Sequence, residues 1–208
     1  MTGAADVRRE GWRGRLRCVS ACAVVVLTAA TLTYGSNAGA AASAGGAGAR
    51  AAVPGSGGES EFDFLIGEWK VRHRRLKSIL RGSSDWYEFD GRLVARKFWQ
   101  GRGHIDEFTG DGPAGAVDGM SIRIYDPESK QWRDYYTSAS RRILDPPLIG
   151  RFAGGRAEFY GHELFEGRSI FVRQVWTSID LRACRWEQAF SEDGGKTWET
   201  NWIMDLSR

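Results

Sequence analysis

Hydrophobic and polar residues alternate in short runs from Phe62 to Arg208, which is the period of β-strands that bury one face. Nowhere in this part of the chain do apolar residues recur at helical spacing over three turns. The alternation predicts strands near residues 68–76, 85–98, 104–109, 119–126, 131–139, 149–153, 156–165, 168–178, 182–191 and 197–206. About ten strands joined mostly by hairpins predict an all-β fold, either an antiparallel meander closed into a barrel or a sandwich.

Turn residues separate the predicted strands. Asp126-Pro127 begins a proline-led turn, and Gly154-Gly155 is typical of a tight one. Because proline cannot donate to a sheet ladder, Asp145-Pro146-Pro147 marks an edge or a break in the sheet. Phe62–Gly67 precedes the first strand and is expected to form a short helical turn or a lid.

The clearest hairpin signal lies at Ser191–Trp198. Asp193-Gly194-Gly195 supplies the positive backbone angles that a tight reversal needs. The segment also matches the Asp-box pattern that sialidase-like propellers repeat, but it occurs once, and residues 62–208 are too few for several four-stranded blades. We therefore expect a structural turn in which Ser191 and Asp193 bond turn amides.

Strand parity indicates which side chains share a face. One set is rich in aromatic rings and includes two glutamines: Trp132 and Tyr136 with Asp134 between them, Val172, Gln174, Trp176, Trp186, Gln188, Phe190, Trp198, Trp202 and Met204. The opposite set is charged or polar and is expected to form solvated cross-strand pairs: Arg173, Arg185, Glu187, Glu199, Asn201 and Asp205. The aromatic set either lines a ligand pocket with the glutamines as polar handles, or fills a core in which each glutamine bonds a neighbour.

The first 61 residues differ in composition from the rest. Five arginines between residues 8 and 17 precede an uncharged, largely apolar run at 18–34, and small residues follow at 36–44. This order predicts an export signal over residues 1–42 and a secreted or extracytoplasmic protein. An uncleaved membrane anchor is the alternative, although a 17-residue run is at the lower limit for a bilayer span. Residues 43–61, rich in Gly, Ala and Ser, are expected to form a flexible linker.

The predicted domain, residues 62–208, has nearly balanced charge. It carries 23 basic and 22 acidic residues, which gives no electrostatic case for nucleic-acid binding. Cys184 is its single cysteine, so no internal disulfide can form and stability must come from packing. We expect a monomer or weak dimer whose partner is a small apolar molecule, with no membrane contact once the leader is cleaved.

The opening Phe62-Asp63-Phe64-Leu65-Ile66-Gly67-Glu68-Trp69 places a Gly-x-Trp element where the first strand begins, and an antiparallel meander follows. In these features residues 62–208 resemble the lipocalin or calycin group. The likeness is to uncharacterised bacterial lipocalin-like proteins, related in architecture to nitrobindins and fatty-acid-binding proteins. The resemblance implies a barrel with a central apolar cavity for a small molecule, and it implies no reaction.

Two histidines are candidates for chemistry inside such a barrel. His73 shares strand parity with Trp69, and His104 with Asp106 and Phe108. Two histidines and a carboxylate can hold a metal, and nitrobindin-like barrels bind haem through one histidine. No His-x-His or His-x-x-x-His spacing occurs, however, so we expect no metal and no cofactor, with haem as the alternative.

Signatures of nucleophilic or phosphate chemistry are absent: the sequence contains no Gly-x-Ser-x-Gly elbow, and Gly101-Arg102-Gly103 does not begin a helix. The leading hypothesis is an exported barrel that binds a small, apolar molecule without chemistry. The alternative is a cyclase or isomerase that uses the same cavity, with His73 or His104 as its acid–base group. The residues expected to contact the ligand are Trp69, His73, His104, Tyr136, Gln174, Trp176, Trp186, Gln188 and Trp202.

Overall fold

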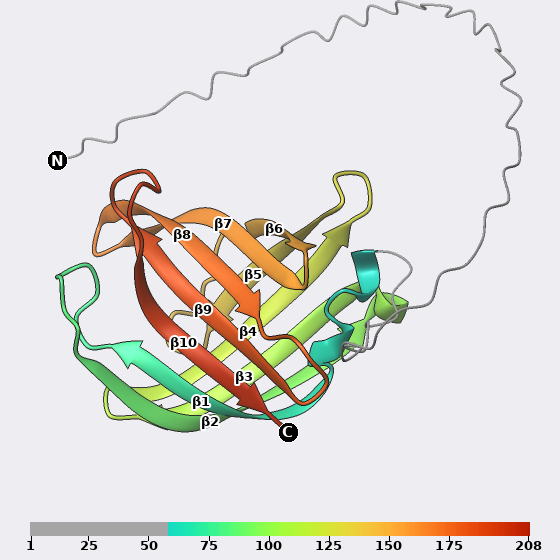
Figure 1. Cartoon of the computed structure of the whole chain (residues 1–208), viewed down its shortest axis with the longest axis horizontal. Helices are drawn as coiled ribbons and strands as arrows, with labels where there is room; N and C mark the ends of the chain where they lie inside the picture. The colour runs from blue at the N-terminus through green and yellow to red at the C-terminus, as the bar shows by residue number, and fades with distance from the viewer. Residues whose placement is uncertain (1–57) are drawn as a thin grey trace, which may run out of the picture. The chain divides into compact units, whose positions relative to one another are not determined.

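The computed structural model of the chain describes residues 58–208 (Figure 1). The predicted export signal and residues 43–57 of the predicted linker lie outside the described residues. Ten strands follow one another in the described part: β1 (Gly67–Leu76), β2 (Trp86–Phe98), β3 (Gly103–Gly112), β4 (Gly115–Asp126), β5 (Gln131–Ser138), β6 (Leu148–Ala153), β7 (Arg156–Phe165), β8 (Arg168–Thr177), β9 (Ala183–Ser191) and β10 (Glu199–Ser207). Three short 3-10 turns accompany them: η1 (Gly58–Ser60), η2 (Asp63–Leu65) and η3 (Trp99–Gly101).

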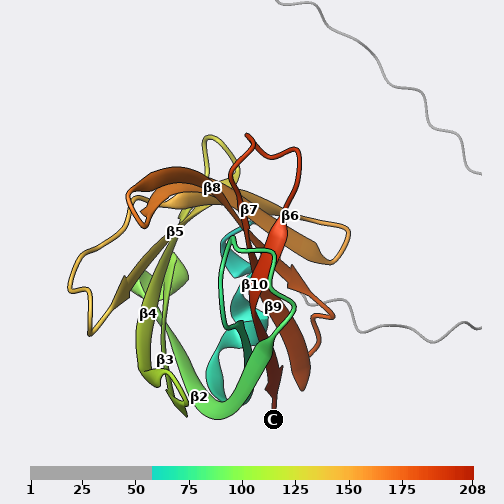
Figure 2. The same cartoon turned by 90° about the vertical axis from the view of Figure 1, so that its left-hand side faces the viewer.

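The strands form a closed antiparallel barrel, in which each pairs with its neighbours in sequence and β1 pairs with β10. Val71 lies opposite Leu206 in the closing pair, and His73 lies opposite Met204. Figure 2 looks into one end of this ring. The all-β meander expected from the alternation is thus confirmed, and closure decides between barrel and sandwich.

The pairing of β5 with β6 is short. It covers Trp132 to Asp134 of β5, which stays paired with β4 as far as Ser138 before the chain leaves the sheet and returns through Asp145-Pro146-Pro147. The break predicted at these prolines is confirmed. β3 and β4 instead extend further than expected, because Gly110, Asp111 and Gly112 continue the ladder to a tight turn before Gly115.

The segment before β1 closes one end of the barrel (Figure 1, cyan). Phe62, Phe64 and Leu65 are at most 1% exposed, because they insert between the strand ends and pack on the core. The Phe62 ring lies edge-on to Trp132, with 5.0 Å between ring centroids. The short helical turn expected at Phe62–Gly67 is confirmed as η2, and it acts as a plug.

Polar contacts hold this plug in place. Trp132 Nε1 donates to Glu61 Oε2 over 2.9 Å, and Trp69 Nε1 donates to the Leu65 carbonyl over 2.7 Å. Arg208 Nη2 donates to the Phe64 carbonyl over 3.1 Å. The plug therefore begins before Phe62, with residues whose composition suggested linker.

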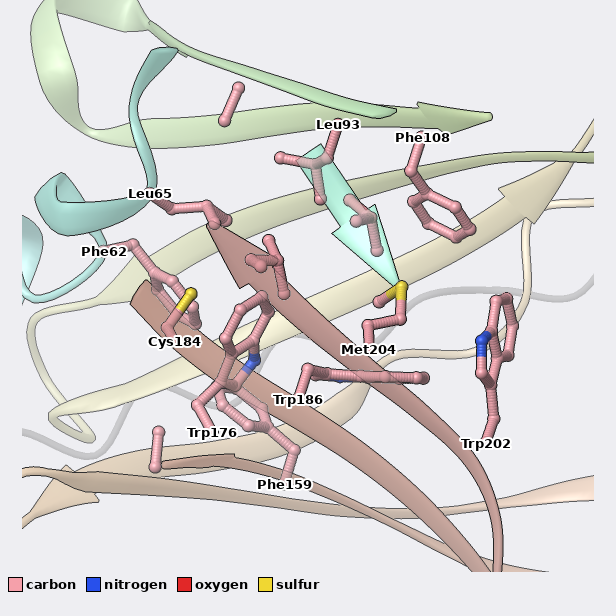
Figure 3. Packing of buried hydrophobic residues seen from close by; sticks show 14 of the residues in the cluster. Phe62, Leu65, Leu93, Phe108, Phe159, Trp176, Cys184, Trp186, Trp202 and Met204 are labelled. Carbon is pink, nitrogen blue, oxygen red and sulfur yellow. The ribbon is translucent and has the colours of Figure 1, made fainter. Parts of the chain in front are cut away.

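Side chains from every strand meet inside the barrel. In Figure 3, Phe62, Phe159 and Trp176 gather at one end of the cluster, whereas Phe108, Met204 and Trp202 lie at the other. The T-shaped packing of Trp186 on Trp202, with 5.4 Å between centroids, belongs to the second group. The aromatic parity set thus points inward, with one exception.

The exception is Trp198, which lies before a register shift between Thr200 and Trp202. This bulge inserts a residue and reverses the parity that the sequence suggested. Trp198 consequently lies outside the barrel, with its ring near Tyr160 at 6.0 Å. Asn201 was expected on the solvated face, but that expectation is wrong: it is fully buried and accepts a hydrogen bond from Gln188 Nε2 over 3.0 Å.

The turn at 191–198 has the structural role predicted for it. Asp193 Oδ1 accepts from the amides of Lys196 and Thr197 over 3.0 and 2.9 Å, and Ser191 Oγ accepts from the Gly195 amide over 2.9 Å. Hydrogen bonds from the Thr197 amide and hydroxyl, together with those from the Ser191 hydroxyl and the Lys196 amide, hold the pKa of Asp193 below its ordinary value. The outer-face pairing is also confirmed at Arg185, which donates to Asp205 over 2.6 Å.

Candidate functional site

Packing fills most of the barrel interior and leaves an inner cavity between the plug and the open end. The volume of this cavity is about 30 Å³, which is room for about two water molecules. Pockets for drug-sized ligands are about 300–1,000 Å³. The inner cavity is therefore an order of magnitude smaller than the central space that the resemblance implied.

The lining of the inner cavity is more polar than a packed core. Five aromatic rings contribute, from Phe108, Tyr136, Trp176, Trp186 and Trp202. Six residues with polar side chains face the same space: Asp106, Ser121, Arg123, Tyr136, Gln174 and Gln188. Buried polar groups are retained where they bond one another or a bound molecule, so each of these needs a partner.

Arg123, Asp106 and Asp134 form a buried triad beside this cavity. They come from the adjacent strands β4, β3 and β5, and each side chain is at most 3% exposed. Arg123 Nε donates to Asp134 Oδ2 over 3.0 Å, and Arg123 Nη1 donates to Asp106 Oδ1. The guanidinium carbon also lies 4.8 Å from the Phe62 ring centroid and 5.3 Å from that of Trp176.

Burial controls the protonation of the triad. Desolvation raises the pKa of Asp134 to about 6, and it also raises the pKa of Asp106, in both cases against the pull of the Arg123 charge. The two carboxylates in turn keep the pKa of Arg123 above its ordinary value in spite of burial. With one cation between two carboxylates, the triad carries an excess negative charge when both are ionised, and a proton on Asp134 removes it.

Sequence reasoning placed Asp106 and Asp134 on inward faces but missed Arg123. In the predicted strand 119–126, Met120 and Ile122 alternate with Ser121 and Arg123, so simple alternation predicts that the arginine points to solvent. In the structure Arg123 is instead buried, with 2% of its surface exposed. The available signal was the pair of inward carboxylates, since buried charges require a paired countercharge.

A larger hollow, which we call the vestibule, occupies the end of the barrel away from the plug. It has a volume of about 390 Å³. Val117 and Phe165 contribute apolar walls, and Tyr136, Gln188 and Trp202 line both the vestibule and the inner cavity. These three residues therefore lie where the two spaces adjoin.

Charged groups surround the apolar walls of the vestibule. The Arg75 guanidinium carbon lies 4.3 Å from the Trp202 ring centroid, and Arg141 makes a two-pronged ion pair with Asp145 at 2.7 and 2.9 Å. Burial, reinforced by the negative charge of Asp145, raises the pKa of Glu163. The vestibule thus combines an apolar body with a polar rim of both signs.

Six of the nine residues expected to contact a ligand line the inner cavity: Tyr136, Gln174, Trp176, Trp186, Gln188 and Trp202. The other three, Trp69, His73 and His104, line neither the inner cavity nor the vestibule. Trp69 packs at the plugged end under Arg208, whose guanidinium carbon is 3.9 Å from the indole centroid. Its role in this structure is to hold the plug.

His73 and His104 are both buried, at 0% and 1% exposed. His73 Nδ1 accepts from Trp202 Nε1 over 3.3 Å, and its ring stacks on Phe89 with 4.5 Å between centroids. The His104 ring lies edge-on to Trp132, with Nε2 3.7 Å from Asp63 Oδ1. Desolvation lowers the pKa of each imidazole to about 4, so both are neutral near pH 7.

The surroundings of His73 do not fit a haem. His73 Nε2 faces Gly91 so closely that a Cβ at that glycine would lie 2.5 Å from it, which leaves no space for an iron. The inner cavity of about 30 Å³ is also far too small for a porphyrin. No acid–base or ligation role for the histidines follows from their positions.

Other reactive groups of the described residues do not gather into a second site. Burial raises the pKa of Cys184 to about 12, so its thiol stays protonated and unreactive. Within residues 58–208, no three His, Cys, Asp or Glu side chains are arranged to hold a metal ion. No helix in this same part of the chain is long and apolar enough to cross a membrane.

No model of a known protein family matches this chain, and a search of the curated proteins finds no sequence that matches it.

Proposed function

We propose that this chain is an exported small-molecule-binding barrel that performs no chemistry on its ligand. The observation that carries the proposal is that the two hollows are adjacent, since Tyr136, Gln188 and Trp202 line both of them. A ligand that occupies the vestibule therefore contacts three of the side chains that also line the inner cavity.

The size and lining of the vestibule support a ligand with an apolar body. About 390 Å³ falls at the lower end of the range for drug-sized pockets. Val117, Phe165 and Trp202 supply apolar contact, while Arg75 and Glu163 supply charge at the rim. The expected ligand is thus amphipathic: a small molecule with the apolar body expected from the sequence and, in addition, a polar group.

Location and family are part of the same proposal. The leader-like composition of residues 1–42 supports export. The Gly67-x-Trp69 element at the head of β1 and the closed ten-strand barrel of the described residues support a place among lipocalin-like proteins. In such an assignment the barrel supplies a container, and its function depends on what the hollows accept.

The positions of the histidines favour binding over the cyclase or isomerase alternative. A general acid or base must come within hydrogen-bond reach of the reacting group, directly or through one water. His73 and His104 line neither hollow, and both are neutral near pH 7. We therefore assign them to packing.

A blocking variant tests the proposal. The purified protein is screened by native mass spectrometry and by quenching of tryptophan fluorescence against a library of small amphipathic compounds. Val117→Trp fills the vestibule and is expected to abolish binding of each compound found. Val94→Trp, the same change on the outer face of β2, lines neither hollow and is expected to leave binding unchanged.

Two results contradict the proposal. One is a protein that takes up no compound and leaves its own host without a bound molecule. The other is binding that Val117→Trp leaves intact, because the ligand would then lie outside the vestibule.

A further inference from the structure

Among the side chains of β8 that line the inner cavity, two polar atoms have no hydrogen-bond partner among the described residues. They are Gln174 Oε1 and Trp176 Nε1. Gln174 is 9% exposed and Trp176 is 1% exposed. In Figure 3 the nitrogen of the Trp176 indole lies on the side of its ring that faces Trp186, another residue of the cavity lining.

These two atoms have complementary chemistry. The indole N–H can only donate, and the amide oxygen of Gln174 can only accept. Because the residues are two apart on one strand, their side chains leave the same face of β8. A group that satisfies both must therefore accept one hydrogen bond and donate another from atoms close together.

The buried triad determines the charge that such a group can carry. Arg123 already bonds two carboxylates, so a ligand carboxylate or phosphate would be a third anion beside one guanidinium. A ligand ammonium would be attracted by the excess negative charge of the triad, but it would also face the Arg123 guanidinium and the positive end of the Trp176 N–H dipole. Burying an unpaired ion costs far more than burying a neutral polar group, so both charged groups are disfavoured.

We propose that the inner cavity holds the uncharged polar end of the ligand, a primary carboxamide or a hydroxyl group, which accepts from Trp176 and donates to Gln174. The inference rests on the proposed function, because the body of the same ligand lies in the vestibule. The size of the cavity agrees with it: about 30 Å³ accommodates a group of two or three non-hydrogen atoms and excludes a second ring.

The test uses compounds that share one apolar body and differ at one end. Naphthalenes carrying a carboxamide, a hydroxymethyl, a carboxylate, an aminomethyl or a methyl group are titrated into the protein near pH 7.5, with calorimetry as the readout. The carboxamide and the alcohol are expected to bind about tenfold more tightly than the methyl compound, since each forms two buried hydrogen bonds. The carboxylate and the amine are expected to bind more weakly than the methyl compound.

Variants of the two lining residues locate the effect. Gln174→Met and Trp176→Phe are each expected to bring the affinity for the carboxamide down to that for the methyl compound, whose own affinity changes little. Gln131→Met and Trp198→Phe are matched controls, because these residues line neither hollow, and they are expected to keep the preference. If Trp176→Phe does not fold, Gln174→Met alone decides the question.

The possible failures are distinguishable. If the methyl compound binds in the vestibule but the carboxylate or amine binds best, or if Gln174→Met keeps the preference, the inference is overturned while the proposed function stands. If no member of the series binds, and none binds with an n-octyl chain as its body, both are rejected.

Discussion

Arg123 and Asp134 lie directly opposite one another on β4 and β5 and share a hydrogen bond of 3.0 Å inside the barrel. Asp106 approaches the same guanidinium from β3. Removal of one member of a buried ionic group leaves the others uncompensated, whereas replacement of the whole group by apolar residues can be neutral. The triad is therefore a strong constraint on which substitutions the barrel tolerates.

Arg123→Met is expected to lower the free energy of unfolding by about 3–5 kcal/mol, because two carboxylates remain buried without a cation. Urea denaturation measures the change. The triple variant Arg123→Met, Asp106→Leu, Asp134→Leu is expected to recover most of the loss. Arg133→Met removes a half-exposed ion pair with Asp126 and serves as the control, with an expected loss of about 1 kcal/mol or less. Equal losses for Arg123→Met and Arg133→Met would show that the buried triad contributes no more to the free energy of unfolding than a half-exposed ion pair.

Asp134 gives the triad a defined pH dependence. Its pKa is about 6 in the folded chain against 3.8 ordinarily, so between these values the folded chain holds a proton that the unfolded chain has lost. The contribution of this group to stability is therefore present at about pH 4 and is lost as the pH rises to about 6. Asp134→Asn cannot ionise, so its stability relative to the native protein is expected to increase over this interval, by at most about 1.4 kcal/mol per pH unit. Urea unfolding at several pH values checks the sign, and a difference that stays constant or shrinks would exclude a raised pKa.

The buried histidines give the stability of the fold the opposite dependence on pH. His73 and His104 each have a pKa lowered from 6.5 to about 4, so between these values only the unfolded chain is protonated. Their contribution is fully present above about pH 6.5 and is lost as the pH falls to about 4. His73→Asn, which keeps an acceptor for Trp202, and His104→Asn are each expected to reduce the loss of stability between about pH 7 and about pH 4.5. If the double variant loses as much stability as the native protein between about pH 7 and about pH 4.5, the imidazoles are not held neutral in the folded chain.

The turn after β9 stabilises the barrel without taking part in binding. Asp193→Ala removes an acceptor shared by the Lys196 and Thr197 amides, so it is expected to lower the free energy of unfolding by about 1–3 kcal/mol. Asp111→Ala, at an exposed position of β3, is the control and is expected to have little effect. Affinity for any ligand of the vestibule is expected to remain unchanged in both. A selective loss of ligand binding in Asp193→Ala would instead give this turn a direct role.

The alternation of residue types was sufficient to predict an all-β antiparallel meander, although not its closure into a barrel rather than a sandwich. Strand ends came within a few residues because glycine, proline and aspartate mark the turns, as at Asp145-Pro146-Pro147. The inward set of rings on β5, β8 and β9 also followed from parity, since a strand changes face at every residue. These features depend on local chemistry, which a sequence displays directly.

The parts that could not be predicted depend on pairing between strands. Arg123 faces inward because its register places it opposite Asp134, although its neighbours Met120 and Ile122 suggested the reverse. Asn201 is buried because a bulge between Thr200 and Trp202 shifts the parity of β10. The volume of the interior could likewise not be predicted from the sequence, since it depends on how far Phe62 and the plug enter the barrel.

The central claim is that a small amphipathic molecule enters the vestibule and reaches the inner cavity. The most direct measurement is the nuclear magnetic resonance spectrum of the indole N–H groups, assigned with Trp→Phe variants, as naphthalene carboxamide is added. The account predicts that the Trp176 and Trp202 resonances shift, while those of Trp69, Trp132 and Trp198 remain in place because they donate to Leu65, Glu61 and Gly195 outside both hollows. Shifts confined to those last three tryptophans, or a spectrum that does not change at saturating compound, would contradict it.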